Sequence, residues 1–207
     1  PYNQEHAIQR MNTLAKNGKD FVFIINYKAD CAYVEETAAV DPSELLFSFP
    51  ALGNIPEDET SKAGPVEWYT EPPSREDYER RISLVKQGER EGDSYLANLT
   101  CRIPVRTNLS LHDIFMRSKA LYRCWLKDRF VCFSPEIFVR INGEGVVSSF
   151  PMKGTIDATR PEAEMELMKN RKEAAEHATI VDLIRNDLSM IAGKVQVKRY
   201  RYVDHVT

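Results

Sequence analysis

The spacing of apolar residues predicts a chain in which helices and short strands alternate. Residues 3–16 carry apolar side chains on one helical face, and Asn17-Gly18 follows as a stop signal. Residues 21–27 form a continuous apolar run, which is typical of a strand covered on both faces, and residues 32–35 are expected to pair with it. Further strands are predicted at 45–49, 94–102, 122–126, 130–133, 138–141, 146–149 and 195–203.

Helix-start signals mark the remaining elements. Ser74 begins a capping-box pattern, so a helix is predicted from there to about Gly88. Residues 159–162 are expected to open a long helix that runs to about Ser189, with Met165 and Met168 facing inward. A shorter helix is predicted at 111–121, a hairpin turn at Asn142-Gly143, and a loop or flap at 53–73. These elements predict an α+β fold with mostly antiparallel sheet.

The composition narrows the class of protein. The 207 residues include 28 Lys and Arg and 31 Asp and Glu, and 43% are hydrophobic. This apolar fraction argues against a disordered chain, and the near-neutral balance argues against nucleic-acid binding. No apolar run approaches the ~18 residues of a membrane span, and no N-terminal signal pattern is present, which predicts a cytoplasmic protein away from membranes. Only residues 194–201 are locally basic, and they are interpreted as a solvated face.

The four cysteines show no metal-binding spacing. None forms a CxxC pair, and each lies in or beside an apolar stretch, so buried free thiols are expected and zinc is improbable. They are Cys31, Cys101, Cys124 and Cys132.

Lys153 is the first candidate for chemistry. It lies between Pro151 and Gly154, in the segment that joins a predicted strand to the long helix. A lysine there can lose its proton by desolvation and act as a nucleophile, or it can hold an anion as a fixed cation. The alternative is an ordinary solvated loop lysine, which is the more frequent case for lysine taken alone.

Glu173 and Glu176 are the second candidates, because residues three apart project from one side of a helix. If the pair is exposed, the repulsion costs only ~0.2–0.5 kcal/mol. If it is buried, two charges about 5 Å apart repel by about 3 kcal/mol at an effective dielectric constant of about 20, which demands a cation such as Mg²⁺. The apolar residues 177–181 that follow predict that this half of the helix is buried.

Glu136 is the third candidate, since Pro135 before it can aim the carboxylate into a cleft; the alternative is a turn acid. His177 is expected to be a packed helix histidine. The charged and polar residues Asp182, Arg185, Asn186 and Asp187 are expected to form a buried ion-pair network at the helix end.

Four segments together resemble the chorismate-utilising enzymes, in order and in spacing. They are residues 92–100 (GDSYLANLT), 134–136 (SPE), 151–155 (PMKGT) and 173–188 (EAAEHATIVDLIRNDL). The resemblance runs over residues 74–207 and is loose over residues 1–73, which we expect to be an N-terminal subdomain. It implies a layered sandwich of mostly antiparallel sheet with helices outside, and Mg²⁺-dependent chemistry on chorismate.

Lys153 discriminates within the family. Anthranilate synthases have a small residue at this position, whereas the lysine form resembles the aminodeoxychorismate synthase branch. The resemblance implies that Lys153 forms a covalent adduct with chorismate, that Glu136 transfers protons, and that Gly154 and Thr155 contact the substrate. It also implies that Glu173 and Glu176 hold Mg²⁺ and that a glutamine amidotransferase partner supplies ammonia.

The chain is also expected to be a piece of a longer protein, because it starts at Pro1 and stops within a strand-like alternation. Family members continue through further acidic metal ligands and a carboxylate-binding arginine. The fold is therefore expected to be incomplete at the C-terminus, and the fragment itself to be inactive. Two other functions stay open: anthranilate synthase component I or another chorismate enzyme, and a non-catalytic module that binds chorismate or a partner.

Overall fold

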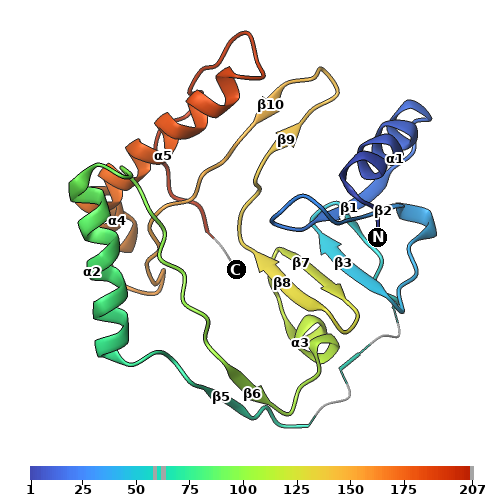
Figure 1. Cartoon of the computed structure of the whole chain (residues 1–207), viewed down its shortest axis with the longest axis horizontal. Coiled ribbons are helices and arrows are strands. Elements are labelled where there is room, and N and C mark those ends of the chain that lie inside the picture. Colours follow the sequence, from blue (N-terminus) through green and yellow to red (C-terminus); the bar gives the residue numbers. More distant parts are fainter. Residues whose placement is uncertain (58–59, 62–63, 206–207) are drawn as a thin grey trace. The chain divides into compact units, whose positions relative to one another are not determined.

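The computed structural model describes residues 1–57, 60–61 and 64–205 (Figure 1). The chain divides into two compact units, one formed by residues 1–57 and 118–207 and the other by residues 58–117. The first unit contains α1 (Gln4–Lys16), β1 (Phe21–Ile25), β2 (Ala32–Glu36), the 3-10 turn η1 (Thr37–Ala39), β3 (Leu45–Phe49), β4 (Leu52–Gly53), β7 (Tyr122–Leu126), β8 (Phe130–Ser134), β9 (Arg140–Ile141), β10 (Val147–Ser148), α4 (Ala163–Lys169) and α5 (Arg171–Ser189). The second contains β5 (Trp68–Thr70), α2 (Arg75–Glu91), β6 (Val105–Thr107) and α3 (Leu111–Arg117).

The predicted first helix and hairpin are confirmed. Asn3 caps α1 by accepting a hydrogen bond from the backbone N–H of His6, and β1 pairs with β2 in antiparallel register. Ala7 and Leu14 of α1 pack against Ala32 and Val34 of β2. The helix therefore covers part of one face of this two-stranded sheet.

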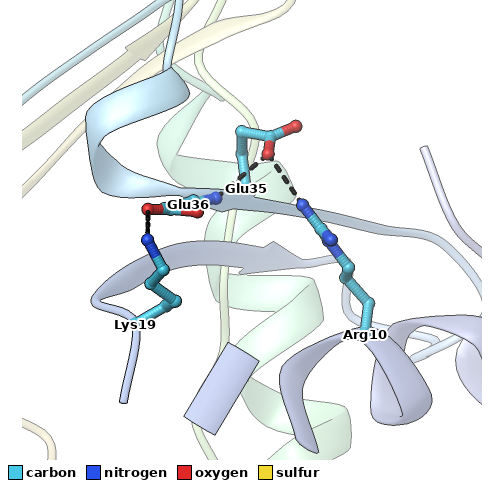
Figure 2. A network of polar contacts seen from close by, with 4 residues as sticks. All are labelled: Arg10, Lys19, Glu35 and Glu36. Carbon is cyan, nitrogen blue, oxygen red and sulfur yellow. Dashed lines mark hydrogen bonds and ion pairs between the residues drawn. The ribbon is translucent and has the colours of Figure 1, made fainter. Parts of the chain in front are cut away.

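Two ion pairs at the edge of this layer tie β2 to the residues around α1 (Figure 2). Arg10 donates to Glu35 at 3.1 Å, and Lys19 donates to Glu36 at 2.9 Å. Glu35 and Glu36 are the last two residues of β2. The end of this strand is therefore bound both to α1, through Arg10, and to the turn after α1, through Lys19.

The prediction that residues 21–27 form a strand covered on both faces was wrong in part. The strand stops at Ile25, and the side chains of Phe23 and Ile25 are 53% and 45% exposed. Phe21 packs against the α1 cluster, whereas Phe23 and Ile25 on the same face are exposed, so α1 covers only part of that face.

A sheet with the order β4-β3-β7-β8 holds the main core of the described residues. All of its pairs are antiparallel. Leu45 and Phe47 of β3 are fully buried, and Cys124 of β7 packs with them and with Val22 of β1. The β7–β8 hairpin, predicted from its alternation, leads directly into Ser134-Pro135-Glu136.

The β9–β10 hairpin also follows the prediction. The Asn142 side chain accepts hydrogen bonds from the backbone N–H groups of Glu144 and Val146, and Gly145 takes the left-handed conformation with φ 76°. A segment without regular structure then leads from β10 to α4.

The long helix predicted from residue 159 is two helices, so that expectation was wrong. Asn170 ends α4 and caps α5, because its side chain accepts hydrogen bonds from the backbone N–H groups of Lys172 and Glu173. An asparagine whose side chain caps the first turn of the following helix competes with a continuous helix. Met165 and Met168, expected inward, are 41% and 36% exposed.

Two predicted strands are absent from the described part of the chain. Residues 94–102 and 195–203 have no regular secondary structure. Alternation alone does not make a strand, since its backbone groups need a neighbouring strand, and none pairs with either segment.

The second unit has its own antiparallel strand pair, β5 with β6, between which α2 lies in the sequence. The predicted cap of α2 is confirmed, because the Ser74 hydroxyl accepts a hydrogen bond from the backbone N–H of Asp77. The helix runs past the predicted stop near Gly88 and ends at Gly92, whose φ of 86° suits a left-handed cap. The predicted loop at 53–73 contains β5, and its residues 58, 59, 62 and 63 lie outside the described residues.

The α+β class with antiparallel sheets is therefore confirmed. The predicted boundary between residues 73 and 74 falls inside the second unit and stays a prediction. Among the described helices, none has the length and the apolar character required to cross a bilayer.

Candidate active site

Five of the six candidate residues line one pocket of the first unit. The pocket has a volume of about 1240 Å³ and is bounded by the end of the β7–β8 hairpin, the segment between β10 and α4, the two C-terminal helices and the segment after α5. The candidates in its wall are Glu136, Lys153, Gly154, Thr155 and Glu173.

Glu136 is fixed against the lysine segment by a hydrogen bond. Its Oε2 accepts from the backbone N–H of Met152 at 2.8 Å, next to Lys153. Behind it, the Ser134 hydroxyl donates to the Glu136 carbonyl at 2.9 Å and accepts from the Glu136 N–H at 3.3 Å. The carboxylate therefore belongs to a tight turn and also reaches the candidate site.

Gly154 brings the lysine segment against α5. Its φ is 76°, and a Cβ built on it would lie 2.9 Å from Oε2 of Glu173 and 2.9 Å from Cδ1 of Leu167. Only glycine fits both the backbone conformation and the space. The turn after Lys153 is thus in contact with the first carboxylate of the helix pair.

The side chain of Lys153 is exposed, so the desolvated amine considered from the sequence is not what the structure describes. Among the described residues, no carboxylate forms an ion pair with it. Thr155, also exposed, lies on the same segment and lines the pocket. The amine is therefore free to meet a ligand in the pocket.

Glu173 and Glu176 are less buried than expected. Their side chains are 20% and 43% exposed, and α5 has no fully buried residue in the described chain. Glu176 does not line the pocket. The expectation that the helix is buried around this pair was wrong.

A cation does lie between the two carboxylates, and it is Lys172. Its ammonium nitrogen is 3.6 Å from Oε1 of Glu173 and 3.0 Å from Oε1 of Glu176. The contact with Glu176, and then that with Glu173, raises the pKa of Lys172. The carboxylates therefore converge on one positive group.

This geometry fits part of a Mg²⁺ ligand set. Mg²⁺ prefers oxygen ligands and is usually held by one or two carboxylates together with a substrate anion. Within residues 1–57, 60–61 and 64–205, no group of three or more His, Cys, Asp or Glu side chains could hold a metal. The two glutamates would supply two ligands at most.

The sequence analysis missed the segment after α5 as part of the pocket. Arg199, Arg201 and His205 line it. Arg201 donates to the carbonyl of Met168 at 2.8 Å, and the Arg199 guanidinium lies 4.0 Å from the ring centre of Tyr202. The alternation of basic and aromatic residues over 199–202 could have indicated this wall of the pocket, but residues 194–201 were interpreted as a solvated face.

His177 is partly buried, as expected of a packed helix histidine. Its ring meets that of Tyr200 edge-on at 5.3 Å between centroids. Burial, and then the charge of Arg201, lowers the pKa of His177. The contact holds the segment after α5 on the helix.

Two structural expectations were wrong. The ion pair between Arg185 and Asp182 is 3.3 Å long, but the side chains are 54% and 81% exposed, so it is no buried network. The four cysteines are free, yet only Cys124 is buried, and Cys31 and Cys132 are exposed.

Comparison with known proteins identifies the family. The family model described as "chorismate binding enzyme" matches residues 3–206. The chain belongs to the chorismate-binding enzyme family. No solved structure matches it.

The curated relatives differ in how much of the chain they match. An "Uncharacterized PabA-like protein" of Haemophilus influenzae is 39% identical over 98% of the chain and 61% of its own length. Anthranilate synthase component 1 of Acetivibrio thermocellus is 35% identical over 64% of the chain and 31% of its own length. A "Probable aminodeoxychorismate synthase, chloroplastic" of Oryza sativa subsp. japonica is 32% identical over 63% of the chain and 16% of its own length. The chain thus spans about three fifths of its PabA-like relative. It is similar both to an anthranilate synthase and to a probable aminodeoxychorismate synthase.

Proposed function

We propose that the protein carrying this chain is component I of an aminodeoxychorismate synthase. It would convert chorismate and ammonia into 4-amino-4-deoxychorismate, a folate precursor, with the ammonia supplied by a glutamine amidotransferase partner in the cytoplasm. The observation that carries the proposal is the arrangement around Lys153. This lysine lines the pocket between Met152, which binds Glu136, and Gly154, which contacts Glu173.

Lys153 and Glu136 would perform the covalent step. Glu136 takes a proton from the Lys153 ammonium, and the free amine attacks C2 of chorismate. The ring double bond shifts, the C4–O bond breaks, and the proton held by Glu136 leaves with the hydroxyl as water. The hydrogen bond from the Met152 N–H would hold the Glu136 carboxylate against the segment that carries Lys153 during this step.

Ammonia would complete the reaction by attack at C4. The double bond shifts back and the C2–N bond to Lys153 breaks, so the amine is regenerated. The balance is chorismate and ammonia in, aminodeoxychorismate and water out. Thr155 and Gly154, on the segment with Lys153, would contact the ring during both steps.

Glu173 and Glu176 would hold Mg²⁺ at the edge of the pocket. When bound, Mg²⁺ would neutralise a carboxylate of the dianionic substrate. Lys172 would have to give way, because its ammonium now lies between the two carboxylates. The side chains of Lys172 and Glu176 are 75% and 43% exposed, so Mg²⁺ could replace the ammonium without repacking of a core.

The product identifies the reaction. The complete gene product should be incubated with chorismate, ammonium and Mg²⁺, and the product identified by mass. Aminodeoxychorismate, absent from the Lys153→Ala variant, is the expected result. Formation of anthranilate or isochorismate would instead place the protein in another branch, and binding of chorismate without turnover would make it a non-catalytic module.

A further inference from the structure

Two cysteines face each other across the β7–β8 hairpin. Cys124 of β7 is the direct antiparallel partner of Cys132 of β8, so both side chains lie on one face of the sheet. Residues opposed in this way have Cα atoms about 4.5–5.5 Å apart. A disulfide spans about 4.4–6.8 Å, so the strands already provide the required backbone distance.

The two thiols lie in unequal surroundings. Cys124 belongs to the buried core of the sheet, and burial raises the pKa of its thiol to about 12. Partial burial also raises the pKa of Cys132, but the interaction with Cys124 opposes that rise, and the Cys132 residue is exposed. Cys132 is therefore the reactive member and Cys124 lies behind it.

We propose that Cys124 and Cys132 are a modification site at which a low-molecular-weight disulfide closes an intramolecular disulfide between β7 and β8. Cys132 loses its proton and attacks one sulfur of the small disulfide, whose other half leaves as a thiol. Cys124 then loses its proton and attacks the Cys132 sulfur, which expels the second thiol. Two protein thiols are oxidised, and one small disulfide is reduced to two thiols.

The other cysteines do not share this geometry. Cys31 lies just before β2 and Cys101 lies in an irregular segment, and neither has a cysteine as a strand partner among the described residues. The proposed bond would cross the hairpin four residues before Glu136. It would therefore cross-link the hairpin that leads to Glu136 in the pocket wall.

The test uses the full chain with Cys31→Ser and Cys101→Ser, so that only the proposed pair remains. The probe is oxidised glutathione. Intact mass should show loss of two hydrogens, and trypsin, which cuts at Arg123, Lys127, Arg129 and Arg140, should leave residues 124–127 linked to residues 130–140. The rate should rise about tenfold per pH unit below the pKa of Cys132, because the thiolate is the nucleophile.

Single replacements separate the two roles. Cys124→Ser should stop the reaction with one glutathione on Cys132, whereas Cys132→Ser should react far more slowly. The proposal is overturned if the pair in the folded serine background keeps one glutathione on Cys132 without closing. It is also overturned if the link forms only in urea, since the folded hairpin would then not favour it.

Discussion

The Glu173 carboxylate occupies the space beside Gly154 that any side chain at position 154 would need. A Cβ on Gly154 would approach Oε2 of Glu173 to 2.9 Å. This contact joins two motifs that are 19 positions apart, the lysine segment and the acidic helix pair. The close approach of the Lys153 segment to the proposed metal ligand Glu173 therefore requires that residue 154 has no side chain.

Gly154→Ala should destabilise the protein and move Glu173. The φ of 76° alone costs an alanine about 1–2 kcal/mol, and the clash with Glu173 and Leu167 should add about 1–3 kcal/mol. Urea unfolding measures the change.

Two other glycines are matched controls for that substitution. Gly145 has the same φ of 76° but no atom within 4 Å of its would-be Cβ, so Gly145→Ala isolates the backbone strain. Gly143 has open space as well and is not in the left-handed region, so Gly143→Ala should be nearly neutral. Equal losses at 154 and 145 would show that the contact with Glu173 is unimportant.

Asn170→Ala should loosen the first turn of α5, which carries Glu173. The asparagine accepts hydrogen bonds from two backbone N–H groups, and loss of such a cap costs about 0.5–2 kcal/mol. Asn170→Asp keeps the acceptor at the positive end of the helix and should retain the stability. Hydrogen exchange of the amides of Lys172 and Glu173 should be faster in the alanine variant, and unchanged exchange there would contradict the cap.

Glu176→Gln should weaken Mg²⁺ binding by more than about tenfold, because a carboxylate ligand becomes a neutral amide. Lys172→Gln should tighten it severalfold, since the ammonium then no longer competes with the metal for the two carboxylates. Titration of the complete gene product with Mn²⁺, followed by electron paramagnetic resonance, measures binding apart from turnover.

The control for the metal prediction is Glu166→Gln. Glu166 is exposed and paired with Arg160 at 2.8 Å, but it does not line the pocket, so binding should not change. If Glu176→Gln and Glu166→Gln behave alike, the helix pair does not hold the metal.

Lys153→Arg distinguishes a nucleophile from a fixed charge. Arginine keeps the positive charge but has no readily deprotonated amine, so both Lys153→Arg and Lys153→Ala should lose most aminodeoxychorismate formation. With ammonia withheld, mass spectrometry should find an adduct on the peptide that contains residues 151–155. An arginine variant with full activity and no adduct in the wild type would reject the covalent role.

His177 should make stability depend on pH. Its pKa is lowered in the folded chain, so below about pH 6.5, the ordinary value for histidine, the unfolded chain binds more protons than the folded one. The free energy of unfolding should therefore fall as the pH drops from 6.5 toward the lowered pKa and level off below it. Urea titrations at pH 7.5, 6.5 and 5.5 should show a shallower fall for His177→Gln than for the exposed control His6→Gln.

Local signals in the sequence were enough to predict α1, the capped start of α2 and the hairpins β7–β8 and β9–β10. Each depends on hydrogen bonds or side-chain alternation within a few neighbouring residues. The motifs at 134–136, 151–155 and 173–188 likewise placed the chain in its family, since they depend on residue identity and spacing. The candidates Glu136, Lys153 and Glu173 then proved to line one pocket.

Only the tertiary structure decided which of these predicted segments find partners. The alternation at 94–102 and 195–203 remains without a strand because no neighbouring strand among the described residues supplies its hydrogen bonds. The carboxylates of Glu173 and Glu176 meet the ammonium of Lys172 in place of a buried environment, because α5 has no fully buried residue among the described residues. The contact of Gly154 with Glu173 depends on how a loop meets a helix, and no pattern along the sequence encodes a distance between them.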